Sequence, residues 1–111
     1  MAFDWSKYLD LARLLMDRSE EESHRSAISR AYYAAFGSAM LALSTAGHKV
    51  PVDGSAHEYV WSAYQNADDG PLFYIGQDGA RLRKMRRIAD YESGYLVSRM
   101  LIERITKANR Y

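Results

Sequence analysis

The chain has 111 residues, a length typical of one domain with a single hydrophobic core. Its composition is 48% hydrophobic, 13% aromatic and 26% charged, which is typical of a globular protein and excludes an intrinsically disordered chain. Fifteen Lys and Arg residues against fourteen Asp and Glu give a net charge of +1, and there is no Cys. Overall charge therefore does not favour nucleic-acid or membrane binding, and disulfides, thiolate catalysis and cysteine-ligated metal centres are excluded.

The domain organisation and the location follow from what the sequence lacks. No apolar run approaches the roughly 20 residues that span a bilayer, and residues 1–10 contain no basic and then apolar signal segment. Two Pro residues, without a low-complexity stretch or an internal repeat, indicate no linker. We therefore expect one domain over residues 1–111, in the cytoplasm and not bound to a membrane.

Two amphipathic segments open the chain. Apolar residues recur at helical spacing from Phe3 to about Arg18, with Asp4 placed to cap the start. Ser19 and Glu22 fit a capping box, which predicts a second helix that continues to about Ala46. Because alanines, tyrosines and aliphatic residues lie on most sides of this second helix, we expect it to be central and buried.

The second half predicts shorter elements. Ser55 and Glu58 fit another capping box at the start of a third helix. Residues 66–79 contain three glycines and Pro71, so we expect a loop that lays residues 72–75 over the core. Asp78 is predicted to cap a fourth helix, and residues 90–94 predict a turn. A final apolar stripe follows, formed by Val97, Met100, Leu101 and Ile105.

No segment alternates with the period of two that a strand requires. The sequence therefore predicts an all-α fold, an antiparallel up-and-down bundle of four to five helices. Phosphate-binding glycine loops, nucleophile elbows and zinc-binding motifs are absent, and the three His residues are dispersed. We expect neither a metal nor a cofactor.

The fourth helix carries a cluster of cations in an otherwise nearly neutral chain. We call it the basic cluster, and its members are Arg81, Arg83, Lys84, Arg86 and Arg87. Three of them, Arg83, Arg86 and Arg87, fall on roughly one helix face, where guanidinium groups suit phosphate oxygens. The cluster is thus a candidate nucleic-acid or phosphate-binding surface. The alternative is a solvated face that pairs with acidic residues elsewhere, namely Glu20, Glu21, Glu22 or Glu58.

A second candidate is a polar network. Asp90 lies one helical turn after Arg86, and together with Arg30 and His57 it is predicted to form a structural network that fixes helix packing. We expect Arg30 and Asp90 to lie within ion-pair distance, because each would otherwise carry an unpaired charge near packed helices.

Residues 25–36, RSAISRAYYAAF, resemble the hallmark helix of the HEPN superfamily, in its small stand-alone prokaryotic branch. Three further pieces agree in order and spacing. They are Trp5-x-x-Tyr8-Leu9-x-x-Ala12-x-x-Leu15, His57-x-x-Val60 and Leu82-x-x-Met85-Arg86-x-x-Ala89-Asp90-Tyr91. The resemblance extends over residues 5–91, and the Ser-Arg-Ala-Tyr-Tyr-Ala-Ala-Phe segment is its specific part.

The resemblance implies a helical bundle that commonly forms a homodimer and works beside a minimal nucleotidyltransferase in a toxin–antitoxin pair. Many relatives are metal-independent ribonucleases with an Arg followed about four to six residues later by a His. The Arg would stabilise the phosphorane charge, and the His would transfer protons. By this resemblance the Arg is Arg86. Five residues further on, this chain has Tyr91 in place of a His, and Arg87 stands where an Asn is expected.

Three hypotheses follow. The chain could be a nucleotide- or RNA-binding module whose nucleotidyltransferase partner adenylylates Tyr91. It could be a ribonuclease with Arg86, Tyr91 and His57 as catalytic residues, or a non-catalytic helical homodimer. Loss of a general acid–base group typically costs a factor of about 10² to 10⁴, whereas arginines hold phosphates without one. The departure at Tyr91 therefore favours binding over catalysis.

Overall fold

The computed structural model describes residues 2–94, which contain four α-helices and no strand. The helices are α1 (Ser6–Met16), α2 (Glu21–Thr45), α3 (Ala56–Gln65) and α4 (Gly70–Tyr91). The predicted all-α class is confirmed. The predicted apolar stripe at Val97, Met100, Leu101 and Ile105 lies outside the described residues.

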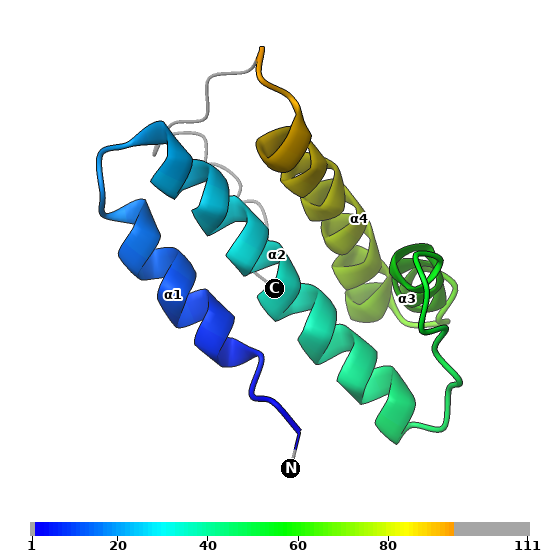
Figure 1. Ribbon diagram of the computed structural model, residues 1–111. Helices are drawn as coiled ribbons and strands as arrows, with labels where there is room; N and C mark the ends of the chain where they lie inside the picture. The colour runs from blue at the N-terminus through cyan, green and yellow to red at the C-terminus, as the bar shows by residue number, and fades with distance from the viewer. Residues whose placement is uncertain (1, 95–111) are drawn as a thin grey trace.

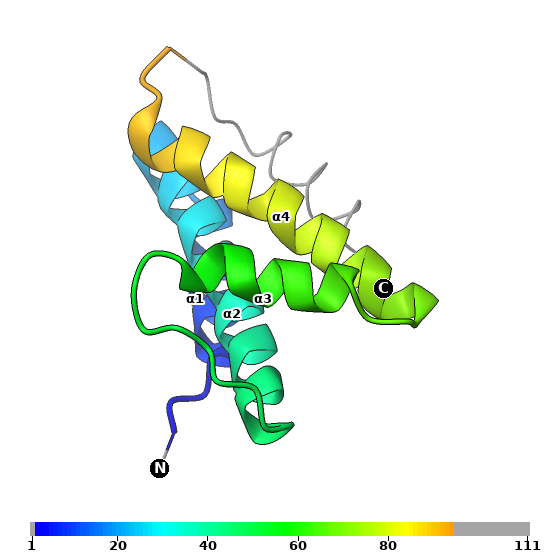
Figure 2. The ribbon, with the colours of Figure 1, turned by 90° about the vertical axis from the view of Figure 1, so that its right-hand side faces the viewer.

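Three helices form an antiparallel layer with α2 in the middle. Figure 1 shows α1 and α4 on either side of α2, each running in the direction opposite to it. The short helix α3 is seen nearly end-on in that view, and Figure 2 shows it crossing the layer and packing on α4. The up-and-down arrangement therefore holds for α1, α2 and α4, while α3 lies across them.

The central position of α2 follows from its composition. One buried cluster joins α2 to α3 and α4 through Tyr32, Phe36, Val60, Trp61 and Leu82, with Ala39 and Ala56. A second cluster joins α1, α2 and α4 through Ala12, Ala27, Ile28 and Ala89. Small alanine side chains allow the helix backbones to approach closely, so the predicted burial of this helix is confirmed.

The start of α4 differs from the prediction. The expected loop over residues 66–79 is short, and α4 begins at Gly70, with Asp69 as its N-cap and Pro71 in its first turn. Oδ1 of Asp69 accepts a hydrogen bond from the Leu72 N–H at 3.1 Å. Asp-Gly-Pro is therefore a helix start, and Asp78, predicted as the cap, lies buried inside the helix.

The glycines inside α4 serve helix packing and do not break the helix. A Cβ on Gly76 would lie 2.7 Å from the Gln65 backbone nitrogen, and one on Gly79 would lie 2.2 Å from the Trp61 ring. Only glycine lets α3 approach α4 so closely. The sequence pattern that predicted a loop is thus the signature of a helix crossing.

The helix starts also differ in detail from the predicted capping boxes. The N-caps of α2 and α3 are Glu20 and Ser55, and neither makes a side-chain cap hydrogen bond. Before α3, Oδ1 of Asp53 instead accepts a hydrogen bond from the Ser55 N–H at 2.9 Å. Asp4 does the same for the Ser6 N–H at 3.0 Å before α1. A carboxylate is the stronger acceptor, which explains the preference.

None of the four helices combines the length and the apolar character needed to cross a membrane, as far as residues 2–94 are concerned.

Candidate functional site

The basic cluster of α4 is divided among three directions. Arg81 turns to Asp78, with Nη1 and Oδ1 3.4 Å apart. Lys84 and Arg87 are exposed and line a groove of about 440 Å³ together with Arg83. Arg83 and Arg86 are partly buried, and the Arg86 side chain is only 11% exposed. Arg83 and Arg87 therefore share a groove with Lys84, whereas Arg86 does not line that groove and Arg81 is turned to Asp78.

The acidic residues proposed as alternative partners do not pair with the cluster within residues 2–94. Glu20 pairs with Arg18 at 3.2 Å, and Glu21 pairs with Arg25 at 2.9 Å. The ion pairs of the cluster are instead made with Asp78 and Asp90 of the same helix.

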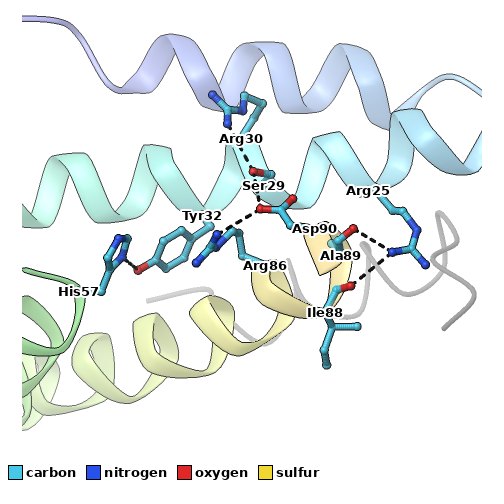
Figure 3. A network of polar contacts seen from close by, with 9 residues as sticks. All are labelled: Arg25, Ser29, Arg30, Tyr32, His57, Arg86, Ile88, Ala89 and Asp90. Atoms are coloured by element: carbon cyan, nitrogen blue, oxygen red, sulfur yellow. Dashed lines mark hydrogen bonds and ion pairs between the residues drawn. The ribbon is translucent and has the colours of Figure 1, made fainter. Parts of the chain in front are cut away.

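Asp90 joins α4 to α2. Its Oδ2 accepts a hydrogen bond from Nη1 of Arg86 at 3.2 Å and one from the Ser29 hydroxyl at 3.5 Å. Nη2 of Arg30 in turn donates to the Ser29 oxygen at 3.4 Å (Figure 3). Arg30 therefore reaches Asp90 only through Ser29, and the predicted direct ion pair is wrong.

Packing explains why Arg30 does not contact Asp90. The guanidinium carbon of Arg30 lies 4.7 Å from the ring centre of Tyr8 on α1 and 5.4 Å from that of Tyr33. Cation–π attraction thus holds Arg30 toward α1. Arg86, one turn before Asp90 on the same helix, is the nearer partner for the carboxylate.

Arg86 also lies among aromatic rings. Its guanidinium carbon is 5.6 Å from the ring centre of Tyr32, 5.7 Å from that of Tyr33 and 6.0 Å from that of Tyr91. Tyr91 is 75% exposed. Arg86 and Tyr91 are therefore close in space, and the Tyr91 side chain is exposed.

His57 is held by a chain of hydrogen bonds. The Trp61 indole N–H donates to the Tyr32 oxygen at 3.1 Å. The Tyr32 oxygen in turn lies 2.6 Å from Nδ1 of His57, as Figure 3 shows. An indole N–H can only donate, so the Tyr32 oxygen is the acceptor from Trp61. The roles of the Tyr32 hydroxyl and of His57 Nδ1 depend on the tautomer of His57, and we assign the tautomer in which the hydroxyl donates to Nδ1. The ring proton of neutral His57 is then on Nε2, which is assigned here from the network.

The pKa of His57 is also shifted toward the neutral ring. Burial, followed by the positive charges of Arg83 and Arg86, lowers the pKa of His57 below its ordinary value. The ring also stacks on Phe36, with centres 4.2 Å apart. His57 is thus a neutral N–H donor near two guanidinium groups. The predicted network of Arg30, His57 and Asp90 therefore divides into two sets of hydrogen bonds. The first set contains Arg30, Ser29, Asp90 and Arg86, and the second contains His57, Tyr32 and Trp61. The two sets come together where the Arg86 guanidinium lies over the Tyr32 ring.

Arg83 has no counter-ion among residues 2–94. No carboxylate there forms an ion pair with it, and its Nε is buried without a hydrogen-bond partner. The Nε of Arg86 is likewise unpartnered. Arg83 and Arg86 of α4 and His57 of α3 therefore offer positive charge or N–H donors. Within the described part of the chain, Asp90 is the one carboxylate that pairs with any of them. Such an arrangement attracts an anion.

Two residues outside the predicted site residues contribute to the site. The Tyr32 hydroxyl makes the hydrogen bond to His57. Nη1 of Arg25 donates to the carbonyl oxygens of Ile88 and Ala89, at 3.3 and 2.9 Å, and so caps the end of α4 from α2 (Figure 3). The antiparallel pairing of α2 with α4, once known, places the start of one helix beside the end of the other.

The other histidines serve local contacts. Nε2 of His24 lies 2.6 Å from the Arg18 carbonyl oxygen, and Nδ1 of His48 lies 3.2 Å from the Tyr59 hydroxyl. In the part of the chain that the structure describes, His, Asp and Glu side chains do not gather into a group of three that could hold a metal ion.

Comparisons with family models, with curated proteins and with solved structures give no match for this chain. The likeness to the HEPN superfamily therefore rests on the motif residues themselves.

Proposed function

We propose that this chain is a HEPN-like module that binds the phosphates of a nucleotide or of RNA, as the cytoplasmic partner of a minimal nucleotidyltransferase in a toxin–antitoxin type system. The observation that carries the proposal is Arg83, a partly buried cation with no counter-ion within residues 2–94, beside Arg86 and the neutral ring of His57. The exposed Lys84 and Arg87 extend the positive surface along α4.

The positive charges and hydrogen-bond donors of Arg83, Arg86 and His57 support phosphate binding more than catalysis. Arg83 and Arg86 provide forked donors for phosphate oxygens, and the Nε2–H of His57 provides a third donor. In the assigned tautomer Nδ1 of His57 accepts from Tyr32 and Nε2 carries a proton, so the neutral ring offers a phosphate a hydrogen-bond donor.

The direct test measures binding of a labelled single-stranded RNA and of ATP to the full chain. We expect Arg83→Gln to weaken binding about ten-fold or more, because hydrogen bonds to charged groups contribute roughly 1.5–3 kcal/mol each. Arg13→Gln is the matched control, since Arg13 lies on α1, is largely exposed and pairs with Asp10. Equal affinities for the two variants, or no binding of either ligand by the wild type, would overturn the proposal.

The second candidate function is a metal-independent ribonuclease, with Arg86 stabilising the phosphorane and His57 or Tyr91 transferring the proton. Two short separations favour this function. Arg86 lies close enough to His57 to lower the pKa of the histidine, and its guanidinium carbon lies 6.0 Å from the Tyr91 ring centre. Purified protein is incubated with total RNA beside an Arg86→Ala variant. Cleavage lost in the variant supports this function, and equal cleavage contradicts it.

The partner is tested by co-expression with a minimal nucleotidyltransferase encoded beside the chain. We expect co-purification and a mass increase of one nucleotide on Tyr91, whose exposed ring is open to such an enzyme. Tyr91→Phe should bind the partner but gain no mass. A homodimer, implied by the same resemblance, is tested by the solution mass. A monomeric chain that neither co-purifies nor gains mass counts against the partnership and leaves phosphate binding to its own test.

A further inference from the structure

A pocket of about 340 Å³ lies where α2, α3 and α4 meet, and it touches the candidate functional site only through Trp61. Its walls are formed by small or apolar side chains, among them Ala35, Ala39, Trp61 and Leu82. The volume is within the range of pockets that take small ligands.

The pocket is open because neighbouring positions carry little side chain. On α4, Gly79 lets the Trp61 ring lie against the helix backbone, since a Cβ there would come within 2.2 Å of the ring. On α2, Ala35, Ser38 and Ala39 face the pocket with short side chains. A larger residue at these positions would fill the space.

A single carboxylate interrupts this apolar lining. Asp78 is 7% exposed and lies in the pocket wall. Its Oδ1 lies 3.4 Å from Nη1 of Arg81, whose side chain is 57% exposed. Its Oδ2 is buried and has no hydrogen-bond partner among residues 2–94. Burial of a carboxylate oxygen without a partner is costly, which is also why burial raises the pKa of Asp78.

We propose that this pocket binds a small primary amine with an apolar tail, whose ammonium group donates hydrogen bonds to Oδ2 of Asp78 while its tail packs against Trp61 and Leu82. An ammonium group supplies the missing donor and the opposite charge together. A metal ion would need further ligands, and no group of three His, Asp or Glu side chains that could bind one is found within residues 2–94. This inference is independent of the phosphate-binding proposal.

The test compares three ligands of one shape on the full chain. They are 2-phenylethylammonium, 2-phenylethanol and 3-phenylpropionate, and binding is followed by the NMR shift of the Trp61 indole N–H. We expect the ammonium to bind about ten-fold or more tightly than the alcohol, and the carboxylate to bind most weakly, because a charge-assisted hydrogen bond is present only with the first.

Two variants connect that preference to Asp78. Asp78→Asn should reduce the preference for the ammonium over the alcohol to about one. Asp68→Asn, the same change at an exposed position between α3 and α4, should leave it as in the wild type. Equal binding of ammonium and alcohol, a preference that survives Asp78→Asn, or no shift of the Trp61 signal with any ligand at millimolar concentration would overturn the inference. Should Asp78→Asn fail to fold, the comparison in the wild type alone decides.

Discussion

At the scale of single residues, the chemistry of the candidate site depends on one proton. Trp61 donates to the Tyr32 oxygen, and in the assigned tautomer the Tyr32 hydroxyl donates to Nδ1 of His57. His57 therefore presents Nε2–H while Arg83 and Arg86 disfavour a second proton on its ring. This combination offers an anion a neutral donor beside two cations.

Removing the charge of Arg83 should raise the pKa of His57. Burial is the largest cause of the lowered value and Arg83 is the next, so Arg83→Gln makes protonation of the ring easier. The measurement is an NMR titration of the His57 ring in both proteins. Arg13→Gln, on α1, should leave the titration as it is in the wild type, and an unchanged midpoint in Arg83→Gln would contradict the assignment.

The lowered pKa of His57 also predicts how stability depends on pH. The unfolded chain protonates this histidine near pH 6.5, while the folded protein resists protonation until the pH is lower. In the interval between the two values the unfolded state binds more protons, so the free energy of unfolding falls as the pH falls.

Urea denaturation at a series of pH values below about 6.5 measures this dependence. The His57→Gln variant should lose less stability over the interval than the wild type does. The same decrease in both proteins would mean that His57 does not cause it.

At the scale of helices, the glycines of α4 are compatible with two interpretations, a loop or a closely packed helix. Gly70, Gly76 and Gly79 with Pro71 are typical of a loop, and a loop was the prediction for residues 66–79. In the structure Asp69 caps the helix, Pro71 occupies its first turn, and Gly76 and Gly79 face α3. The sequence could not separate the two cases, because the need for glycine comes from the helix that crosses it.

Gly76→Ala separates a packed helix from a loop. Alanine normally stabilises a helix by roughly 1 kcal/mol relative to glycine, but here its Cβ would lie 2.7 Å from the Gln65 backbone nitrogen. We expect a net destabilisation of about 1–3 kcal/mol, measured by urea denaturation.

Gly54→Ala is the matched control, since a Cβ there meets nothing within 4 Å. Its effect should stay within about 0.5 kcal/mol. A neutral or stabilising Gly76→Ala would show that α3 does not press against α4 at this point.

At the scale of the whole molecule, the attraction for an anion depends on where the charged side chains lie and not on the net charge. The chain carries a net charge of only +1, so attraction for an anion comes from the cations that packing brings together. Arg81 is turned to Asp78, whereas Arg83 and Arg86 lie toward α2 and α3. Polyanion binding should therefore depend on a few residues of α4.

The salt dependence of RNA binding tests this placement, on the basis of the proposed function. For single strands, the logarithm of the association constant falls with the logarithm of salt by about 0.7 for each phosphate neutralised. Arg83→Gln should reduce the slope by about that amount, and Arg13→Gln should leave it unchanged. The measurement is fluorescence anisotropy between low and moderate salt, and identical slopes would place Arg83 outside the contact.

The sequence by itself determined the helical class, the central place of the Ala- and Tyr-rich helix and the positions of the cations, because period and composition are local properties. Only the tertiary structure decided that His57 bonds Tyr32, that Arg30 reaches Asp90 through Ser29, and that Asp78 lies buried in a pocket wall. These contacts join residues far apart in the chain. Their geometry depends on how α3 crosses α4 and how closely each helix approaches α2, which no local pattern specifies.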